Sequence, residues 1–510
     1  MRAHRAMLVV VVLSFAYRLP PLLNAGDTNS DAAIVGLQAM HILRGEFSWL
    51  LFGSTYQTSV DSMAAAAWFA VLGATPFALM LSALVGHVIL TLSAYGTLAR
   101  HVPKTSAALL VSPLIFCSAA VHGNALYPPR QMALTLVFLA FYVIDDLDAS
   151  PRDLLRAAAG GAIALLSCFA DPYALIFLPL LGLHLVLVSF VSWSPAANVN
   201  RWAKRIGAAA AGAIAGTVPL ALLLTSPHSR HGETKLTFAV VSHNFAVLRE
   251  ACLPWVFGTK VYAPLHEMDY VPWTAPPAVA ALQWLGASAL AVLLAASACV
   301  PEVPWRVRRL GIVGLLAMPL TSVAFLLSPM VMDHFSARYL VSMLLLLPFA
   351  LAPVAFKLRE WRFAACLAPY VASSAIGGWV AFAPATSGLA IRSGLSRDDE
   401  AMGERLRTLG VHVAMADYWV AYREAFLFQE NPIVVPSHAA QDRYRPYRER
   451  FAREGEYAYL VDRWRSEEPE KAVQERLELS GARYERIEVG DLVAFVVHAS
   501  PAKTPGLASR

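Results

Sequence analysis

Two carboxylates, those of Asp27 and Asp31, follow the first apolar run of the chain and stand four residues apart. A carboxylate held just outside a membrane can act as a general base that removes the proton of an acceptor hydroxyl or amine. Asp31 falls in the first turn of an expected helix over residues 30–44, with Ser30 as the predicted N-cap. The competing interpretations are structural, because acids are common in first helical turns and in loops.

Other polar residues on the same predicted side of the membrane are candidates for substrate binding. His41 shares a face of the expected helix with Asp31, and Asp61 begins the next apolar stretch. Cations at a membrane surface can hold a lipid-linked phosphate, arginine in a bidentate fashion. The candidate cations are Arg130, Lys235, Arg249 and Arg338. The alternative for each of them is contact with lipid headgroups.

The sequence indicates neither a metal site nor a surface for nucleic acid. Its 5 cysteines include no pair with the spacing of metal ligands. His228 and His231 are three residues apart, but no third ligand is fixed by spacing. We therefore predict no certain cofactor and leave a divalent metal open. Nucleic acid is not an expected partner, because the basic residues form no stripe interleaved with aromatics.

Composition predicts the elements that must carry these residues. Hydrophobic residues make up 57% of the chain and charged residues 15%, whereas soluble domains contain ~25% charged residues. Mean hydropathy is +0.51. We expect a polytopic membrane protein with about eleven helical spans of ~20 apolar residues. They are placed near residues 6–23, 76–98, 105–121, 131–147, 154–169, 174–192, 207–225, 277–299, 310–328, 339–356 and 363–383.

Basic residues predict the orientation of the chain. One alternate set of loops contains 15 Lys and Arg residues and the other contains 8, and the richer set is cytoplasmic by the positive-inside rule. The first apolar run is followed by no cleavage site, so we interpret it as an uncleaved span with a cytoplasmic N-terminus. An odd number of spans then places the C-terminal segment outside. The two long outer loops, 24–75 and 226–276, are expected to be functional.

The C-terminal part of the sequence differs from the membrane domain, for which we predict bounds of 1–390. Helical stretches alternate there with short apolar runs, which predicts a small soluble α/β domain over 391–500, and 501–510 is expected to be a disordered tail. Helices are expected at 400–409, 419–428, 439–453 and 468–479, and strands at 411–416, 432–435, 457–461, 484–489 and 492–497. The predicted fold class is an all-α polytopic membrane protein with a small extracytoplasmic α/β domain.

The run Asn29-Ser-Asp-Ala-Ala-Ile-Val-Gly-Leu-Gln-Ala-Met-His-Ile-Leu-Arg-Gly45 resembles the first-loop motif of the GT-C membrane glycosyltransferases. The nearer branch is that of the protein O-mannosyltransferases and aminoarabinose transferases, in which an Asp begins a juxtamembrane helix that ends in a Gly. By this resemblance Asp31 matches the catalytic Asp, and Arg338 lies in an Arg-Tyr element before a late span. Ala32 stands where the family often has Glu. Similarity to the branch extends to 52–61, 72–80, 170–179 and 336–342.

The resemblance implies an inverting hexosyl- or pentosyltransferase in a bacterial cytoplasmic membrane. Its expected partners are membrane lipids, a polyprenyl-phosphate sugar donor, and a glycan, lipid or protein acceptor at the outer face. One alternative is a transporter or lipid flippase, a class that needs ionisable residues within the membrane and is often built from paired repeats. Another is a non-catalytic membrane scaffold whose C-terminal domain binds a partner.

Overall fold

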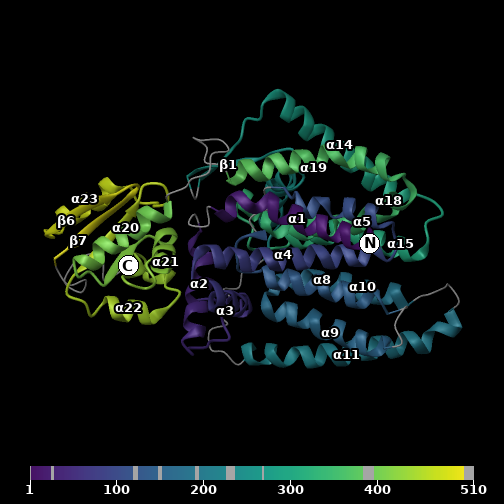
Figure 1. Cartoon of the computed structure of the whole chain (residues 1–510), viewed down its shortest axis with the longest axis horizontal. Coiled ribbons are helices and arrows are strands. Elements are labelled where there is room, and N and C mark those ends of the chain that lie inside the picture. Colours follow the sequence, from purple (N-terminus) through teal and green to yellow (C-terminus); the bar gives the residue numbers. More distant parts are fainter. Residues whose placement is uncertain are drawn as a thin grey trace.

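The computed structural model describes residues 2–23, 28–118, 125–147, 152–189, 195–224, 236–266, 269–382 and 395–498. Most of the chain before residue 383 forms a bundle of long helices (Figure 1). Asp27 and Lys235, two of the predicted site residues, lie outside the described residues, as does the predicted tail 501–510.

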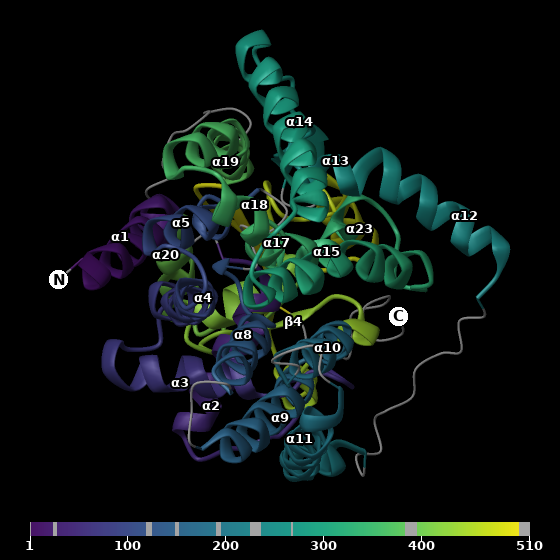
Figure 2. The ribbon, with the colours of Figure 1, turned by 90° about the vertical axis from the view of Figure 1, so that its right-hand side faces the viewer.

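The bundle is built from helices whose bounds are α1 (Arg2–Leu23), α4 (Pro76–Ala99), α5 (Lys104–Leu110), α6 (Ser112–Ile115), α8 (Gln131–Asp145), α9 (Asp153–Ala170), η3 (Pro172–Phe177), α10 (Leu178–Ser189), α11 (Pro195–Leu224), α12 (Phe238–Val247), η4 (Leu248–Cys252), α13 (Leu253–Val256), α14 (Pro277–Cys299), α15 (Trp305–Leu326), η5 (His334–Leu340), α16 (Val341–Leu345), α17 (Leu347–Ala350), α18 (Ala352–Lys357) and α19 (Glu360–Phe382). A short hairpin of β1 (Tyr262–His266) and β2 (Asp269–Pro272) lies in the second predicted outer loop. Figure 2 looks along the bundle, with α9 and α11 on one side of it and α14 and α19 on the other.

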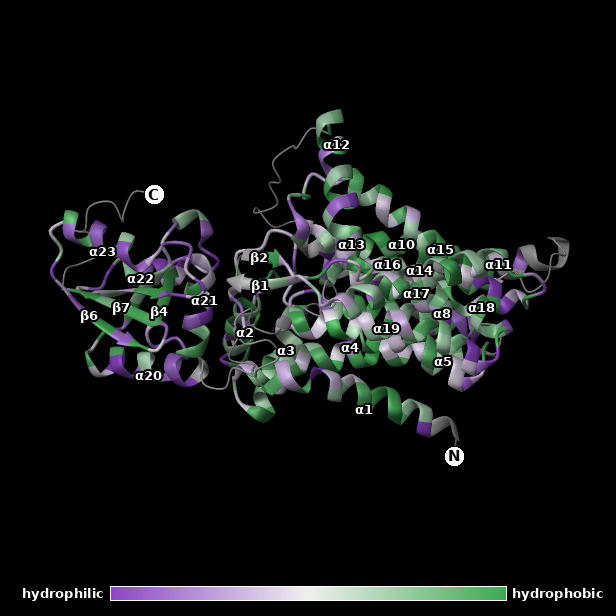
Figure 3. Ribbon diagram, turned by 90° about the horizontal axis from the view of Figure 1, so that it is seen from above, coloured by the Kyte–Doolittle hydropathy of each residue, from purple (hydrophilic) through white to green (hydrophobic). Residues whose placement is uncertain are grey.

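Within the described residues, eight helical segments are long and apolar enough to cross a membrane, judged by length and composition. The three remaining predicted spans overlap α5–α6, α8 and α11. Of these, Lys104–Ile115 and Gln131–Asp145 are apolar but shorter. Figure 3 shows the hydrophobic residues concentrated in the bundle and many hydrophilic ones at the C-terminal end of the chain. The predicted polytopic helical fold is therefore confirmed, with eight spans of full length.

Residues 395–498 form an α/β unit at one end of the bundle (Figure 1). Its sheet has the order β4-β3-β5-β7-β6, in which β3 is parallel to β4 and β5, and β7 is antiparallel to β5 and β6. The strands are β3 (Val413–Ala416), β4 (Ile433–Pro436), β5 (Tyr457–Asp462), β6 (Tyr484–Val489) and β7 (Leu492–Val497), and the helices are α20 (Leu395–Thr408), α21 (Tyr418–Leu427), η6 (Ala439–Gln441), α22 (Arg445–Phe451) and α23 (Glu470–Leu479). The predicted alternation of helices and strands is confirmed, including the strands 484–489 and 492–497, which pair as an antiparallel hairpin.

Two helices from the first outer loop, α2 (Ser30–Leu43) and α3 (Val60–Leu72), lie between the bundle and the α/β unit (Figure 1). They share one hydrophobic core with that unit, and the Phe69 ring on α3 stacks on Phe426 with centroids 5.9 Å apart. In α2, 11 of the 14 residues are buried. This burial arises because α3 and α21 pack against α2.

The beginning of α2 differs from the prediction in one residue. The N-cap is Asn29, whose side chain accepts a hydrogen bond from the Ala32 backbone N–H at 2.9 Å. Ser30, the predicted cap, instead donates its hydroxyl to the Trp419 carbonyl at 2.9 Å and accepts from the Arg423 backbone N–H at 3.2 Å. Both residues are good N-caps, and the contact with α21 places Ser30 inside the helix.

The contact between α2 and α21 requires a glycine at position 36. A Cβ added to Gly36 would lie 2.8 Å from a ring carbon of Phe426, whereas one added to Gly182 on α10 would meet nothing within 4 Å. We expect Gly36→Ala to destabilise the protein by ~1–3 kcal/mol, because extra volume in a packed interface forces side chains to move. Gly182→Ala is the control and should leave the midpoint of thermal unfolding unchanged or higher. Equal midpoints for the two variants would show that this interface is loosely packed.

Candidate active site

Asp31 lies in the first turn of α2, where the partial positive charge of a helix N-terminus favours a carboxylate. Its side chain is 44% exposed although most of α2 is buried. One carboxylate oxygen, Oδ1, accepts a hydrogen bond from the Tyr418 hydroxyl at 2.5 Å and lies 3.9 Å from Nη2 of Arg443. The other oxygen, Oδ2, accepts no hydrogen bond from the described residues. Asp31 thus presents an oriented and accessible carboxylate oxygen.

Tyr418 and Arg443 come from the α/β unit, and sequence reasoning did not find them as site residues. Arg443 donates to the Tyr418 hydroxyl oxygen from Nε at 3.2 Å and from Nη2 at 3.1 Å, and from Nη1 to the Gly53 carbonyl at 3.2 Å. Gly53 has φ +64°, and a Cβ there would lie 2.4 Å from Cα of Arg443. The first outer loop and the α/β unit are therefore interlocked beside Asp31.

A second polar cluster lies where the loop between α2 and α3 meets the bundle, around Arg130 and Asp171. Arg130 Nε donates to Asp171 Oδ2 at 3.1 Å, and the Gln57 amide donates to the same oxygen at 3.0 Å. The Arg130 guanidinium also lies 4.8 Å from the centroid of the Tyr173 ring. Burial raises the pKa of Tyr56, the Asp171 carboxylate adds to this rise, and Arg130 and Arg443 oppose it, so Tyr56 lies near charged groups of both clusters. Arg130, a predicted phosphate ligand, thus already has a carboxylate partner.

Asp61 caps a helix of the bundle. It is buried, and its two carboxylate oxygens accept hydrogen bonds from the backbone N–H groups of Arg130 and Met132, each at 3.1 Å. These N–H groups lie at the N-terminus of α8, where helix donors have no partner within the helix. In the structure Asp61 therefore holds α3 to the first turn of α8.

Arg338 is a predicted cation whose side chain is open to solvent. It is exposed, and its Nη2 lies 3.3 Å from the Tyr339 hydroxyl. No carboxylate pairs with it within the part of the chain that the structure describes. The Tyr339 carbonyl accepts a hydrogen bond from Tyr173, whose ring lies beside Arg130, so Arg338 adjoins the second cluster. Arg249 is also exposed, but it pairs with the adjacent Glu250.

His41 joins α2 to the α/β unit. It is 5% exposed, its Nδ1 lies 2.6 Å from Glu46 Oε2, and its Nε2 lies 2.7 Å from Glu430 Oε1. Glu430 also pairs with Arg44 and accepts a hydrogen bond from Tyr447. Burial lowers the pKa of His41, but the hydrogen bonds to Glu430 and Glu46 outweigh it and raise the pKa above its ordinary value of 6.5. The contacts of His41 are those of an ionic clasp between the two parts of the chain.

This clasp predicts a pH dependence of stability. Because folding raises the His41 pKa above 6.5, its contribution is complete below that pH and is lost as pH rises through the raised value. Burial tends to raise the Glu430 pKa, but hydrogen bonds from His41 and Tyr447 lower it to about 2. The Glu430 contribution is therefore present above its ordinary value of 4.5 and is lost as pH falls toward 2.

Thermal unfolding midpoints should accordingly decline as pH rises above 6.5, and His41→Gln should weaken this decline. The matched control is His412→Gln, because His412 belongs to the α/β unit that His41 contacts but is exposed. An alkaline decline that is identical in the wild type and both variants would assign the pH dependence to other groups.

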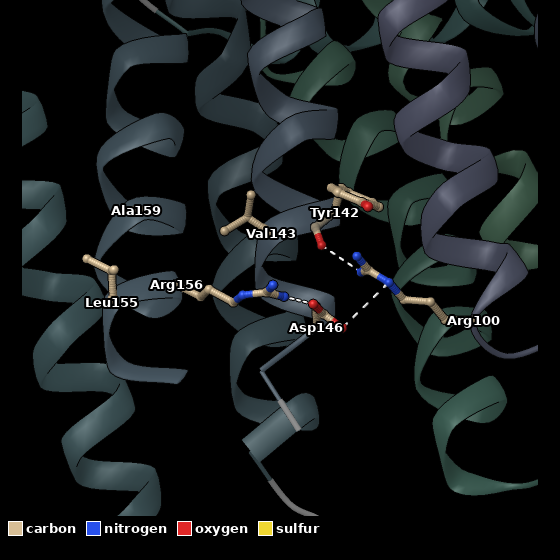
Figure 4. Close-up of a pocket in the computed structure, with 7 residues that line it drawn as sticks. All are labelled: Arg100, Tyr142, Val143, Asp146, Leu155, Arg156 and Ala159. Atoms are coloured by element: carbon tan, nitrogen blue, oxygen red, sulfur yellow. Dashed lines mark hydrogen bonds and ion pairs between the residues drawn. The ribbon is translucent and has the colours of Figure 1, made fainter. Parts of the chain in front are cut away.

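A different group of charged residues lies at the other end of the bundle. Arg100 follows the C-terminal end of α4, whose N-terminal end adjoins α3. Figure 4 shows Asp146 between Arg156, with which it pairs, and Arg100, whose Nε is 3.8 Å away. These residues border a cavity of ≈ 330 Å³ that is lined by Arg100, Tyr142, Val143, Asp146, Leu155, Arg156 and Ala159. Since both arginines have a carboxylate partner, the group serves to hold α4, α8 and α9 together.

The described residues contain no group of three or more His, Cys, Asp or Glu side chains placed to hold a metal ion. His228 and His231 lie outside them.

Comparisons with known proteins give the fold. No known sequence family and no curated protein matches the chain. Its structure is similar to that of ArnT from Cupriavidus metallidurans bound to undecaprenyl phosphate, with a TM-score of 0.59 and 10% identity over 99% of this chain and 98% of that chain. Apo ArnT from the same organism matches with a TM-score of 0.43, 11% identity, and coverage of 95% of this chain and 97% of that one.

The oligosaccharyltransferase of Archaeoglobus fulgidus, in complex with Zn and sulfate, also has a TM-score of 0.43, at 12% identity over 98% of this chain and 74% of that one. The match to lipid-bound ArnT extends over nearly the whole of both chains. The predicted resemblance is therefore confirmed for the fold, which this chain shares with ArnT.

Proposed function

We propose that this GT-C-fold membrane protein is an inverting glycosyltransferase that uses a polyprenyl-phosphate sugar as its donor. One observation carries the proposal. On α2, a helix that is otherwise mostly buried, the Asp31 carboxylate is half-exposed and keeps one oxygen without a hydrogen bond from the described residues. An accessible carboxylate oxygen of this kind can take a proton from an acceptor, as a general base must.

The donor phosphate is assigned to Arg338, an exposed cation next to the Arg130 cluster. The structurally similar ArnT was solved with undecaprenyl phosphate bound, which supports a lipid of this class as the donor carrier here. Arg338 is exposed and paired with no carboxylate of the described residues, and it adjoins the Arg130 cluster through Tyr339 and Tyr173. A guanidinium binds a phosphate with two parallel hydrogen bonds. We assign the phosphate to Arg338, with Arg130 and Asp171 fixing the adjacent surface.

The reaction proposed is a direct displacement. The acceptor oxygen or nitrogen attacks the anomeric carbon as Asp31 Oδ2 takes its proton. The bond between that carbon and the phosphate oxygen breaks, the configuration inverts, and polyprenyl phosphate leaves with the electron pair. Arg338 stabilises the charge that develops on this phosphate. One base and one cation suffice for this displacement.

We place the reaction on the outer face of a bacterial cytoplasmic membrane. The loops predicted to lie on the side of Asp31 carry 8 Lys and Arg residues against 15 on the other side, and the positive-inside rule then puts α2 and the α/β unit outside. The glycan, lipid or protein that accepts the sugar must reach the same side.

Deleting the gene should make a polyprenyl-phosphate-linked sugar accumulate, because its consumption is the step removed. The lipid extract of the deletion strain is compared by mass spectrometry with that of strains that re-express the wild type or Asp31→Asn. The wild type should clear the accumulated lipid and Asp31→Asn should not. No accumulation in the deletion strain, or clearance by both proteins, would contradict the proposal.

A further inference from the structure

We infer that the C-terminal α/β unit supplies two positioning residues to the active site, Tyr418 and Arg443. Together they fix the carboxylate of Asp31 in the orientation that accepts the acceptor proton. The inference rests on the proposed role of Asp31 as the base. It adds that α2 alone does not make a competent base, because the residues that orient Asp31 come from the α/β unit, the nearer of them 387 positions later in the chain.

The direction of the hydrogen bonds follows from donor chemistry. A guanidinium has only donors, so the Tyr418 oxygen must accept the two hydrogen bonds from Arg443, at 3.2 and 3.1 Å. The hydroxyl proton of Tyr418 is then left for Oδ1 of Asp31, 2.5 Å away. The three side chains form a directed chain from Arg443 through Tyr418 to Asp31. Each hydrogen bond in it strengthens the next, since polarised donors are better donors.

This chain matters because an aspartate in the first turn of a helix has competing conformations. Its carboxylate can turn back to accept hydrogen bonds from nearby backbone N–H groups, and a half-exposed side chain has rotamers to choose from. Here Asn29 already caps α2, and Tyr418 holds Oδ1 of Asp31. Oδ2 is thereby directed away from Tyr418, available to an acceptor.

The position of Tyr418 is itself set by the docking of α21 on α2. The Trp419 carbonyl and the Arg423 backbone N–H both bond to the Ser30 hydroxyl, one residue before Asp31. Tyr418 is 8% exposed, and Arg443 is held from the other side by the Gly53 carbonyl. The Tyr418 hydroxyl that contacts Asp31 is therefore held in place by buried neighbours. The contacts that dock the α/β unit on α2 are thus the same ones that place Tyr418 against the Asp31 carboxylate.

The test uses Tyr418→Phe in the full-length protein. Its substrate is the polyprenyl-linked sugar extracted from the deletion strain, and its acceptor is the cell-envelope fraction. A hydrogen bond to a charged group is lost, so kcat should fall by about ten- to a hundredfold, with KM for the donor unchanged. The matched control is Tyr484→Phe, which removes a hydroxyl bonded to a carboxylate (Glu478 Oε1, at 3.0 Å) elsewhere in the unit and should keep the wild-type rate. A wild-type kcat for Tyr418→Phe would overturn the inference.

Two further variants separate positioning from structure. In an Asp31→Asn background Tyr418→Phe should lower the residual rate little, whereas an equal loss in both backgrounds would overturn the inference.

Arg443→Lys keeps the charge and Tyr418 but cannot donate from two nitrogens of a planar fork, and it should lose activity with KM unchanged. If Tyr418→Phe lowers the unfolding midpoint, the Arg443→Lys variant provides the test instead. A wild-type rate for Arg443→Lys would then refute the inference. If Asp31→Asn is itself as active as the wild type, the proposed base fails; if it is inactive and Tyr418→Phe is normal, only the inference fails.

Discussion

Replacing Asp31 with Asn is expected to reduce the rate of sugar transfer by about 10²- to 10⁴-fold, the usual contribution of a general base. The change preserves shape, and the cap of α2 is the neighbouring Asn29. The Asn oxygen can still accept the hydrogen bond that Tyr418 donates to Oδ1. Stability, membrane insertion and donor binding should therefore remain close to those of the wild type. Single-turnover rates with purified protein would measure the loss.

Asp27→Asn is the natural comparison for this variant, since it removes a carboxylate from the same loop. It should reduce the rate less, because Asp27 lies outside the segment 29–45 on which the predicted resemblance rests. An Asp31→Asn protein with the wild-type rate would refute the base assignment. An inactive Asp27→Asn protein beside an active Asp31→Asn one would move the base by four residues and leave the proposed reaction in place.

Replacing Arg338 with Ala should weaken donor binding by about ten- to a hundredfold, the contribution of hydrogen bonds to a charged group. Arg338 is exposed, and its only hydrogen bond to another described side chain is to Tyr339, so the fold should be little affected. The measurement is KM for the polyprenyl-linked donor and, separately, for the acceptor.

Arg249→Ala is the matched control, since Arg249 is also an exposed arginine on the predicted outer side but already pairs with Glu250. Its donor KM should stay at the wild-type value. A donor KM that changes equally in the two variants, or in neither, would return Arg338 to a role in contact with lipid headgroups.

Local patterns in the sequence predicted most of the architecture. Apolar runs of span length coincide with the helices of the bundle, because a bilayer requires the backbone of each span to be satisfied within the helix. The hairpin of β6 and β7 was predicted with its correct ends, since β-rich runs flank a Gly490-Asp491 turn. The helix that carries Asp31 was predicted nearly to its last residue.

The composition of the site could not be predicted in the same way, because its contacts join distant parts of the chain. Tyr418 lies 387 positions from the carboxylate that it contacts, and Arg130 lies 41 positions from Asp171. The sequence predicts a helix over 419–428, and nothing in the local pattern marks Tyr418 as different from a core tyrosine. The cap of α2 illustrates the same limit, since contact with α21 decided between Asn29 and Ser30.

The central claim is that this protein breaks the bond between a sugar and a polyprenyl phosphate. It is tested most directly in detergent solution. There a transporter has no second compartment to move its substrate into, and it would release no polyprenyl phosphate. Purified protein is given the polyprenyl-linked sugar from the deletion strain together with the envelope fraction of that strain, and free polyprenyl phosphate is measured by mass spectrometry. We predict its release with the wild type and near-absence of release with Asp31→Asn. No release with the wild type, or equal release with both proteins, would contradict the account.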